Sequence, residues 1–208
     1  MTFTGFGPEA AKFLEDLTAD NSRTFFEANR PVYRDSIRQP LEDLLGWAEP
    51  VYGPGRVMRP NRDVRFSNDK APYKTAASMW AGAVGGVYLS LHSTHLDVGG
   101  GVYGPSRDQL ARARAAIDSQ PEAATKLTAI VETLTRAGFE MAGPSLTTAP
   151  RGFDRDHPQI NLLRLKHFAA LKPLPVTATR DDVLAGWKAV EPLIAWCDQH
   201  VGAPLSWP

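Results

Sequence analysis

The chain has 208 residues, of which 43% are hydrophobic and 22% charged, with 23 basic and 23 acidic side chains and a formal net charge of zero. This composition excludes a disordered or fibrous chain and predicts a soluble globular protein of about one domain. The balanced charge also argues against a general nucleic-acid-binding protein, which normally carries a strong basic excess, so any electrostatic site must be local.

The cysteine content, the N-terminal stretch and the lengths of the apolar runs predict where the protein is located. Cys197 is the single cysteine, so it cannot form an intrachain disulfide or a cysteine cluster for zinc, which fits a reducing cytosol. Its apolar neighbours Ile194 and Trp196 predict a buried thiol. The N-terminal stretch lacks the pattern of a signal peptide, and no apolar run approaches the length of about 20 residues that spans a bilayer. We therefore expect a cytoplasmic protein without a membrane span.

The first quarter of the chain has the pattern of several short helices. Gly7-Pro8 opens the first one, since proline fits the first turn of a helix. Asn21 is the expected cap of the next helix, in a stretch where apolar residues recur at helical spacing. Pro31 and Pro40 predict breaks or kinks, because proline lacks a backbone N–H and clashes with the preceding turn.

From Arg56 the period of the apolar residues changes to two, which predicts strands. In the first strand Met58, Val64 and Phe66 share one side. The segments TAASMWAG, GVYLSLHS and HLDVGGGVY predict further strands of a half-buried antiparallel sheet. The glycines at 99–101 end this region and predict a bulge or a close approach of backbones.

Helix signals return after these glycines. Ser106, with Gln109 three positions on, predicts a capping box, and a second helix is expected from Pro121 to about Ala137. FEMAG and LTTAP have the pattern of short strands, HPQINLLRLKHF that of a helix and AALKPLPV that of an extended segment. Thr179 is the expected cap of a final helix that runs through Trp196.

This order of elements predicts an α+β fold. Helices come first, a sheet lies in the middle, and helices and strands follow without regular βαβ alternation. We expect a single domain over residues 1–208, with N-terminal helices, a central, mostly antiparallel sheet and C-terminal helices packed on it.

The segment RPNRDVRFSNDKAPYK, residues 59–74, carries five basic and two acidic side chains. Arginine binds planar carboxylates and phosphates in a bidentate manner, and lysine adds a point charge, so the segment predicts an anion site. The expected ligand-binding residues are Arg62, Arg65, Lys70, Tyr73 and Lys74, and the orienting residues are Asp63, Ser67 and Asp69. The alternative is a solvated edge strand with internal ion pairs.

A second polar cluster, APRGFDRDHPQINLLRLKHF, places an imidazole and both charge signs just before a predicted helix. His157 with Asp156 or Asp154 is the candidate acid–base pair, and Lys166 is a candidate ligand-binding cation. If this loop faces the basic segment, the two form one pocket. The alternative is that Asp156 or His157 caps the helix and Pro158 takes its first position.

Metal and cofactor motifs are weak in this sequence. His92, His95 and Asp97 are metal-ligand types, but their spacing is unspecific, so we expect strand histidines and no metal. The glycines at 99–101 lack the lysine-serine ending of a P-loop and the spaced glycines of a dinucleotide fold. No cofactor is expected.

Four segments together resemble a known family: FLEDLTADNSRTFFEANRPVY, NRDVRFSNDKAPYK, VGGGVYGPSRDQLARARAAI and LTTAPRGFDRDHPQINLLRLKHF. They are similar to the bacterial and fungal proteins grouped as domain of unknown function 2461, from about Phe6 into the final helix. The resemblance implies a soluble α+β domain and no particular reaction. One departure from the family pattern is Arg59-Pro60-Asn61, where more apolar residues are usual, and it argues against Arg59 as a ligand-binding residue.

The resemblance also marks the positions of this chain that match the family motifs. They are Arg62, Asp63, Arg65, Phe66, Ser67, Asp69, Lys70, Pro72, Tyr73, Lys74, Gly100, Gly101, Pro105, Pro150, Gly152, Asp156, His157, Pro158 and Lys166.

Three functions fit these observations. The first is a binding protein or enzyme for a small phosphorylated or carboxylated molecule, with catalysis left open. The second is a scaffold or partner-binding domain in which both polar clusters are structural ion-pair networks. The third is a nucleic-acid-associated module that stacks bases on Phe66, Tyr73 or Trp80, against which the neutral net charge counts.

Overall fold

The computed structural model describes residues 3–63, 65 and 70–205. Its strands are β1 (Gly55–Val57), β2 (Ala77–Gly82), β3 (Gly86–Leu91), β4 (His95–Val102), β5 (Glu140–Met141) and β6 (Phe168–Pro175). Its helical elements are α1 (Pro8–Ala19), α2 (Arg23–Ala28), α3 (Arg30–Val32), the π-helical η1 (Tyr33–Arg38), α4 (Gln39–Tyr52), α5 (Arg107–Ser119), α6 (Pro121–Arg136), α7 (Ile160–Leu163) and α8 (Arg180–His200).

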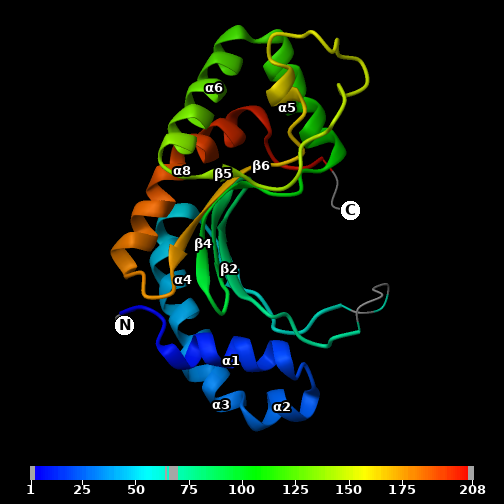
Figure 1. The fold of residues 1–208 in the computed structure, drawn as a ribbon. Coiled ribbons are helices and arrows are strands. Elements are labelled where there is room, and N and C mark those ends of the chain that lie inside the picture. The colour runs from blue at the N-terminus through cyan, green and yellow to red at the C-terminus, as the bar shows by residue number, and fades with distance from the viewer. Residues whose placement is uncertain (1–2, 64, 66–69, 206–208) are drawn as a thin grey trace. The chain divides into compact units, whose positions relative to one another are not determined.

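The strands form one antiparallel sheet in the order β1-β2-β3-β4-β6-β5, with helices at both ends of the chain (Figure 1). This confirms the predicted α+β fold. None of the helices in the described ranges has the length and apolar character that crossing a membrane requires.

The chain divides into two compact units. Unit 1 comprises Met1–Gly82, Tyr88–Val98 and Pro173–Ala185, and unit 2 comprises Ala83–Val87, Gly99–Lys172 and Gly186–Pro208. The strands β3, β4 and β6 and the helix α8 contribute residues to both units, so the division does not follow a linker. The single domain expected from the sequence stays a prediction.

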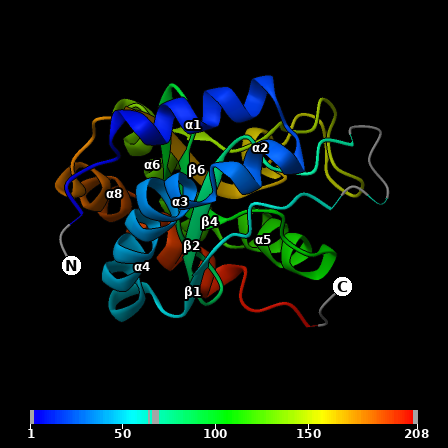
Figure 2. The same ribbon diagram turned by 90° about the horizontal axis from the view of Figure 1, so that it is seen from below.

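In unit 1, α1 begins as predicted, with Gly7 as its cap and Pro8 in its first turn. Figures 1 and 2 show α1 beside α2 and α3, and α4 leading from them to the first strands. The core of unit 1 combines residues from these helices with strand residues that are fully buried: Leu14, Leu17, Ile37, Leu41, Leu44, Met79, Leu89, Leu91 and Leu96.

Two predictions about the N-terminal helices need correction. Asn21 does not cap α2; Ser22 does, because its hydroxyl accepts a hydrogen bond from the Phe25 N–H at 3.1 Å. Pro40 does not interrupt the helical run, because the π-helical turn of η1 precedes it, and the Gln39 N–H there reaches back to the Arg34 carbonyl. The wider turn gives the proline ring the space that a regular α-helix denies it.

The first predicted strand is shorter in the structure. β1 pairs with β2 in the register Arg56 to Trp80 and ends at Val57. Pairing continues only to Met58, whose N–H donates to the Ser78 carbonyl at 2.8 Å, because Pro60 has no N–H to extend the ladder. The other residues of this predicted strand face, at 64 and 66, lie outside the described residues.

In unit 2 the predicted close approach at the glycines is confirmed. A Cβ on Gly99 would lie 1.9 Å from the Ala170 carbonyl oxygen, and one on Gly101 would lie 2.2 Å from that of Phe168. Gly101 also has a φ of +122°, which disfavours any side chain. Glycine therefore allows β4 and β6 to pair here without a steric clash.

The helices of unit 2 begin and end largely as predicted. Ser106 and Gln109 form the capping box of α5, and α6 is followed by Gly138 at a φ of +84°. The Trp196 indole donates to the Ala123 carbonyl at 3.0 Å. Cys197 is buried as expected, and burial raises the pKa of its thiol to about 12.

Two short elements of unit 2 differ from the prediction. LTTAP is not a strand. The Leu146 N–H donates to the Arg164 carbonyl at 2.8 Å, and the Pro150 carbonyl accepts from the Phe153 N–H at 3.2 Å. Pro144 and Pro150 limit pairing on both sides. HPQINLLRLKHF contains only the one-turn helix α7. It is short because Phe168 already belongs to β6.

Candidate functional site

The basic segment of unit 1 forms a two-stranded arm. The Arg62 N–H donates to the Pro72 carbonyl and the Lys74 N–H to the Pro60 carbonyl, both at 2.8 Å. Asn61 and Tyr73 face each other in an antiparallel bridge. These bonds fix Lys74 close to Pro60 although they are far apart in the sequence.

Asn21 anchors this arm to the helices. Its side-chain amide donates to the Tyr73 carbonyl at 3.1 Å and accepts from the Tyr73 N–H at 3.0 Å. The Asn21 amide thus satisfies both backbone polar groups of Tyr73, as a neighbouring strand would do. The Tyr73 ring then stacks on Phe26 at a centroid distance of 4.1 Å.

The predicted ligand-binding residues divide into two groups along the arm. At its outer part, the Arg65 guanidinium pairs with both carboxylate oxygens of Asp63, at 2.7 and 3.0 Å, and 77% of its side chain is exposed. This hydrogen bond lowers the pKa of Asp63. Lys70 is exposed, whereas Ser67 and Asp69 lie outside the described residues.

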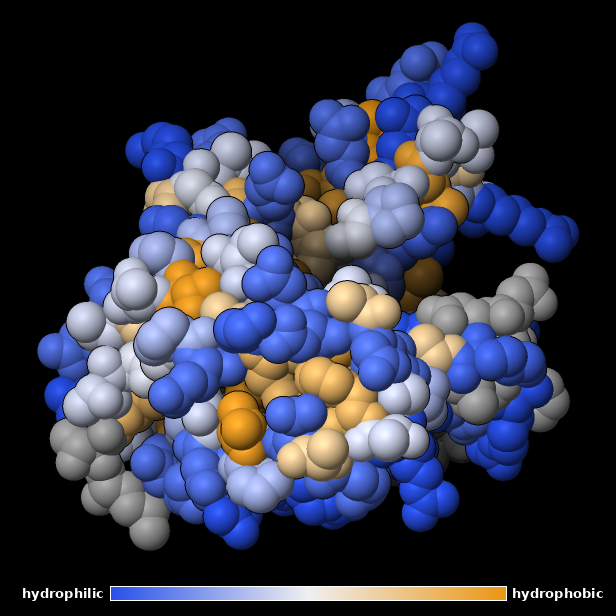
Figure 3. Space-filling model, turned by 60° about the horizontal axis from the view of Figure 1, so that its bottom comes forward, coloured by the Kyte–Doolittle hydropathy of each residue, from blue (hydrophilic) through white to orange (hydrophobic). Residues whose placement is uncertain are grey.

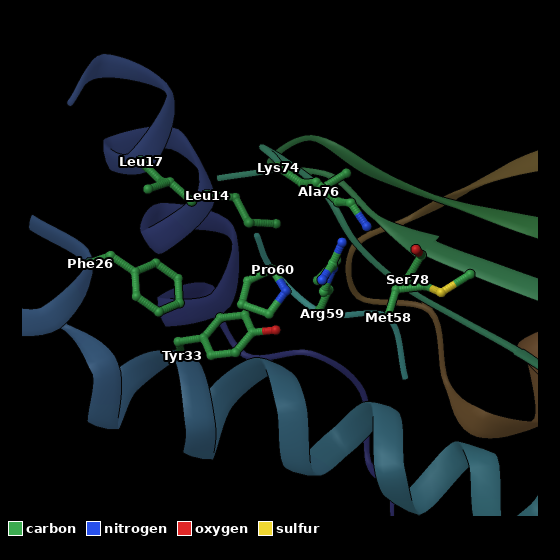
Figure 4. A pocket seen from close by; sticks show the side chains of 11 residues that line it. Leu14, Leu17, Phe26, Tyr33, Met58, Arg59, Pro60, Lys74, Ala76 and Ser78 are labelled. Atoms are coloured by element: carbon green, nitrogen blue, oxygen red, sulfur yellow. The ribbon is translucent and has the colours of Figure 1, made fainter. Parts of the chain in front are cut away.

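At the base of the arm, Lys74 lines a small inner cavity of about 10 Å³ (Figure 4). That volume admits about one water-sized group. Figure 4 shows the nitrogen-bearing ends of Arg59 and Lys74 directed toward one another, with the Tyr33 hydroxyl pointing toward the same region. The remaining lining residues are mostly apolar: Leu14, Leu17, Phe26, Met58, Pro60, Ala76, Ala77 and Ser78.

The electrostatics of the inner cavity favour an anion. Burial, followed by the charges of Arg59 and Arg56, lowers the pKa of Lys74. Within the described residues, no side chain forms a hydrogen bond or ion pair with the side chains of Arg59 or Lys74. The carboxylate of Asp63 offsets part of the charge of Arg59. Adjacent cations repel each other, and a bound anion would relieve the repulsion between Arg59 and Lys74.

Tyr33 adds a polar atom that lacks a partner. Its side chain is 6% exposed, and its hydroxyl is buried without a hydrogen bond among the described atoms. Burial also raises the pKa of this phenol. An unsatisfied buried hydroxyl costs about 1–3 kcal/mol, so its presence at a cavity points to a ligand group or a water that completes it.

An outer groove of about 430 Å³ adjoins the inner cavity and shares Phe26, Tyr33 and Pro60 with it. Its other lining residues are Glu27, Arg30, Arg34, Arg38, Asn61 and Tyr73. The volume lies in the range of small-molecule pockets, and the mixture of aromatic rings and cations suits an anion with a flat or apolar part. Figure 3 shows a face where hydrophilic side chains surround small apolar groups, as on an ordinary surface rather than a broad apolar interface.

Of the nine described residues that line this groove, the sequence predicted only Tyr73 as a ligand-binding residue. Arg30, Arg34 and Arg38 recur every four positions, which places them on one face of a helical run. That spacing was a readable signal. Their charges are partly balanced by ion pairs with Glu27, Asp35 and Glu42. Tyr33 gave no signal, because its burial depends on residues distant in the sequence.

In unit 2, His157 is bonded through both ring nitrogens. Its Nδ1 accepts from the Gln159 N–H at 3.0 Å, and its Nε2 lies 3.3 Å from an oxygen of Asp118. Because Nδ1 accepts this bond, a neutral ring carries its proton on Nε2, on the side of Asp118. The carboxylate partner of His157 is therefore Asp118 of α5, which the sequence did not indicate.

The other predicted residues of this loop lie at the surface. Asp156 is 83% exposed and contacts Arg155 at 3.7 Å, while Asp154 accepts from the Asp156 N–H at 2.9 Å. Lys166 is exposed. Nearby, the Nε of Arg164 is buried without a partner among the described atoms. The basic arm and this loop belong to different units, and the shared pocket stays a prediction.

Comparison with family models gives a match over most of the chain. The model of a family described as Conserved hypothetical protein (DUF2461) matches residues 9–196, in agreement with the resemblance found in the motifs. None of the curated proteins compared with the chain matches it. The family description carries no activity, so the chemistry has to follow from the geometry.

Proposed function

The chain belongs to the DUF2461 family of conserved hypothetical proteins, and from this premise we propose that unit 1 binds a small molecule carrying a phosphate or carboxylate group. Arg59 and Lys74 hold the charge, and the Tyr33 hydroxyl donates to one of its oxygens. The observation that carries the proposal is that two adjacent cations, Arg59 and Lys74, line the same cavity as Tyr33, whose buried hydroxyl has no hydrogen-bond partner among the described atoms.

The inner cavity and the outer groove would each accommodate a different part of the ligand. The inner cavity has room for about one water-sized group, so only a single oxygen of the anion enters it. The outer groove then receives the rest of the molecule against the Phe26–Tyr73 ring pair and the arginines of the helical run. Arginine is suited to this position because its planar group binds carboxylate and phosphate in a bidentate manner.

The proposal concerns binding and assigns no reaction. An acid–base role for His157 and Asp156 stays a prediction, and it would require His157 to release its hydrogen bond to the Gln159 N–H or its contact with Asp118. The cytoplasmic location also stays a prediction.

The test is isothermal titration calorimetry with inorganic phosphate, pyrophosphate, succinate and an aromatic phosphate monoester. We expect at least one of these probes to bind the wild type. A hydrogen bond to a charged group contributes about 1.5–3 kcal/mol, so Lys74→Met and Arg59→Met should each weaken binding by about tenfold or more.

Arg23→Met is the matched control, because it removes one exposed positive charge from unit 1 outside both cavities. It should leave the affinity nearly unchanged. Equal affinities in Lys74→Met and the wild type would overturn the site. No binding of any probe, together with a loss of stability in both cavity variants, would favour a structural scaffold.

A further inference from the structure

A second polar cluster of unit 1 lies where β3 turns into β4. His92 follows β3, while His95 and Asp97 lie two positions apart on one side of β4. The His92 N–H donates to the His95 carbonyl at 2.9 Å, which closes the turn. The turn therefore brings together three side chains that the sequence spacing alone left unspecific.

The donor atoms of these side chains converge. The Nε2 of His92 lies 3.2 Å from one oxygen of Asp97, and the Nε2 of His95 lies 3.6 Å from the other. One donor atom from each of the three residues can be chosen so that all lie within 4.8 Å of one another. The side chains are 28–39% exposed, so an ion from solvent can reach them.

We propose that His92, His95 and Asp97 bind one divalent transition-metal ion, with zinc as the reference ion. In a tetrahedral zinc site with bonds of about 2.0–2.1 Å, neighbouring ligand atoms lie about 3.3 Å apart. Each imidazole nitrogen already lies within 0.3 Å of this separation from one of the two Asp97 oxygens, and one oxygen can serve both after a small adjustment. Two imidazoles and one carboxylate suit zinc, cobalt, nickel or copper, whereas magnesium and calcium prefer oxygen ligands alone.

Thr94 supplies the outer contact that such sites use. Its hydroxyl lies 2.9 Å from the Nδ1 of His95. When Nδ1–H donates to that hydroxyl, the lone pair of Nε2 is left for the metal, and the ring is held in orientation. Thr94 is thus a positioning residue for the proposed site.

Binding requires one movement. The two imidazole rings are stacked, with centroids 4.4 Å apart and planes 5° from parallel, so their lone pairs do not yet meet at one point. A turn of the His92 ring, which Thr94 does not hold, brings them together, and its 34% exposure leaves space for this. Metal binding should therefore separate the stacked rings.

The rest of the chain offers little competition for the ion. In the ranges that the structure describes, these three residues form the one group of at least three histidine, cysteine or acidic side chains with converging donor atoms. Cys197 is buried, and His157 uses both ring nitrogens. A bound metal is therefore expected at the turn.

The experiment is a calorimetric titration of the metal-free full chain with zinc chloride. We expect one equivalent to bind the wild type. His92→Ala, His95→Ala and Asp97→Asn should each lose at least about tenfold in affinity, and Thr94→Val should lose less than any of them. NMR of the imidazole resonances should show the ring separation upon addition of zinc.

His200→Ala is the matched control, because it removes a histidine outside the turn. It should bind zinc as the wild type does. The proposal is overturned if the wild type binds no zinc, or if His95→Ala and Asp97→Asn retain the wild-type affinity. The spectra of each variant report folding, so a misfolded variant is replaced by His95→Gln.

Discussion

The polar loop of unit 2 and the basic arm of unit 1 differ in how their polar groups are satisfied. In unit 2, His157 gives one ring nitrogen to a backbone N–H and the other to Asp118. In unit 1, Arg59 and Lys74 face one another, and the hydroxyl of Tyr33 is buried without a partner among the described atoms. Unit 2 has one exception to this contrast: the Nε of Arg164 is also buried without a hydrogen-bond partner among the described atoms.

This difference distinguishes residues that stabilise the fold from residues whose hydrogen bonds or charges a bound ligand would satisfy. A satisfied buried polar group contributes modestly to stability, whereas an unsatisfied one costs free energy until a partner arrives. Binding sites commonly retain such costs. Substitution of a satisfied polar group should therefore lower the stability, and substitution of an unsatisfied one should raise it.

The largest effect is expected for His157→Ala. The variant should lose about 2 kcal/mol in free energy of unfolding, because it removes one hydrogen bond, the contact with Asp118 and most of a ring that is only 19% exposed. Urea denaturation measures this. Arg155→Ala, in the same loop but with an 84% exposed side chain, should stay within about 0.5 kcal/mol of the wild type. Equal stability of the two variants would contradict the proposal that His157 stabilises the fold.

Asn21→Ala should have a somewhat smaller effect, about 1–2 kcal/mol, because both of its hydrogen bonds to Tyr73 are partly exposed. This variant tests whether the arm of unit 1 is fixed by an anchor distinct from its cations. Asn21→Asp keeps the acceptor but loses the donor, so its stability should lie between the two. Chemical denaturation at neutral pH distinguishes them, and an unchanged Asn21→Ala would show that Phe26 stacking alone holds the arm.

Tyr33→Phe should act in the opposite direction. Removing a buried hydroxyl without a partner should raise the free energy of unfolding by about 1 kcal/mol, while anion binding becomes weaker. Thermal unfolding with and without phosphate measures both quantities. Tyr103→Phe is the control, because Tyr103 is 70% exposed. A loss of stability in Tyr33→Phe would mean that an ordered water already satisfies the hydroxyl.

The smallest effect concerns Asp108 in unit 2. Hydrogen bonds from the Ser106 hydroxyl and the Leu205 N–H, followed by one from Arg112, lower its pKa to about 2. A lowered folded-state pKa stabilises the fold above the unfolded value of about 3.9, and this contribution is lost as the pH falls toward 2. Water screens the group, which keeps the effect small.

The check is the stability of the wild type and of Asp108→Asn between pH 2 and pH 6. The wild type should be more stable at pH 6, and the difference should shrink below about pH 4. A difference that is independent of pH would show that the carboxylate charge contributes nothing.

Features encoded by neighbouring residues were predictable from the sequence. The capping box at Ser106 and the helix end before Gly138 depend on contacts within a few positions, and both are found. The alternation of Val87, Leu89 and Leu91 likewise identified β3, because a buried strand face imposes a period of two. The α+β class followed from the order of such elements.

Long-range polar partners were not predictable in the same way. Asn21 has the composition of a helix cap, yet it bonds the backbone of Tyr73, 52 positions away. His157 lies next to Asp156 in the chain, yet its carboxylate partner is Asp118. Local patterns list the candidates for a hydrogen bond, but the chain path decides which candidate comes within reach.

The sequence by itself determined the fold class, most helix and strand positions and the presence of a basic segment, because each depends on local periodicity and charge. Only the tertiary structure showed that Arg65 pairs with Asp63 while Lys74 turns toward Arg59 and a cavity. The tertiary structure also showed that Tyr33 lines this cavity and that the donor atoms of His92, His95 and Asp97 lie close together at one turn. Desolvation and the convergence of donor atoms depend on three-dimensional distances, which residue spacing does not specify.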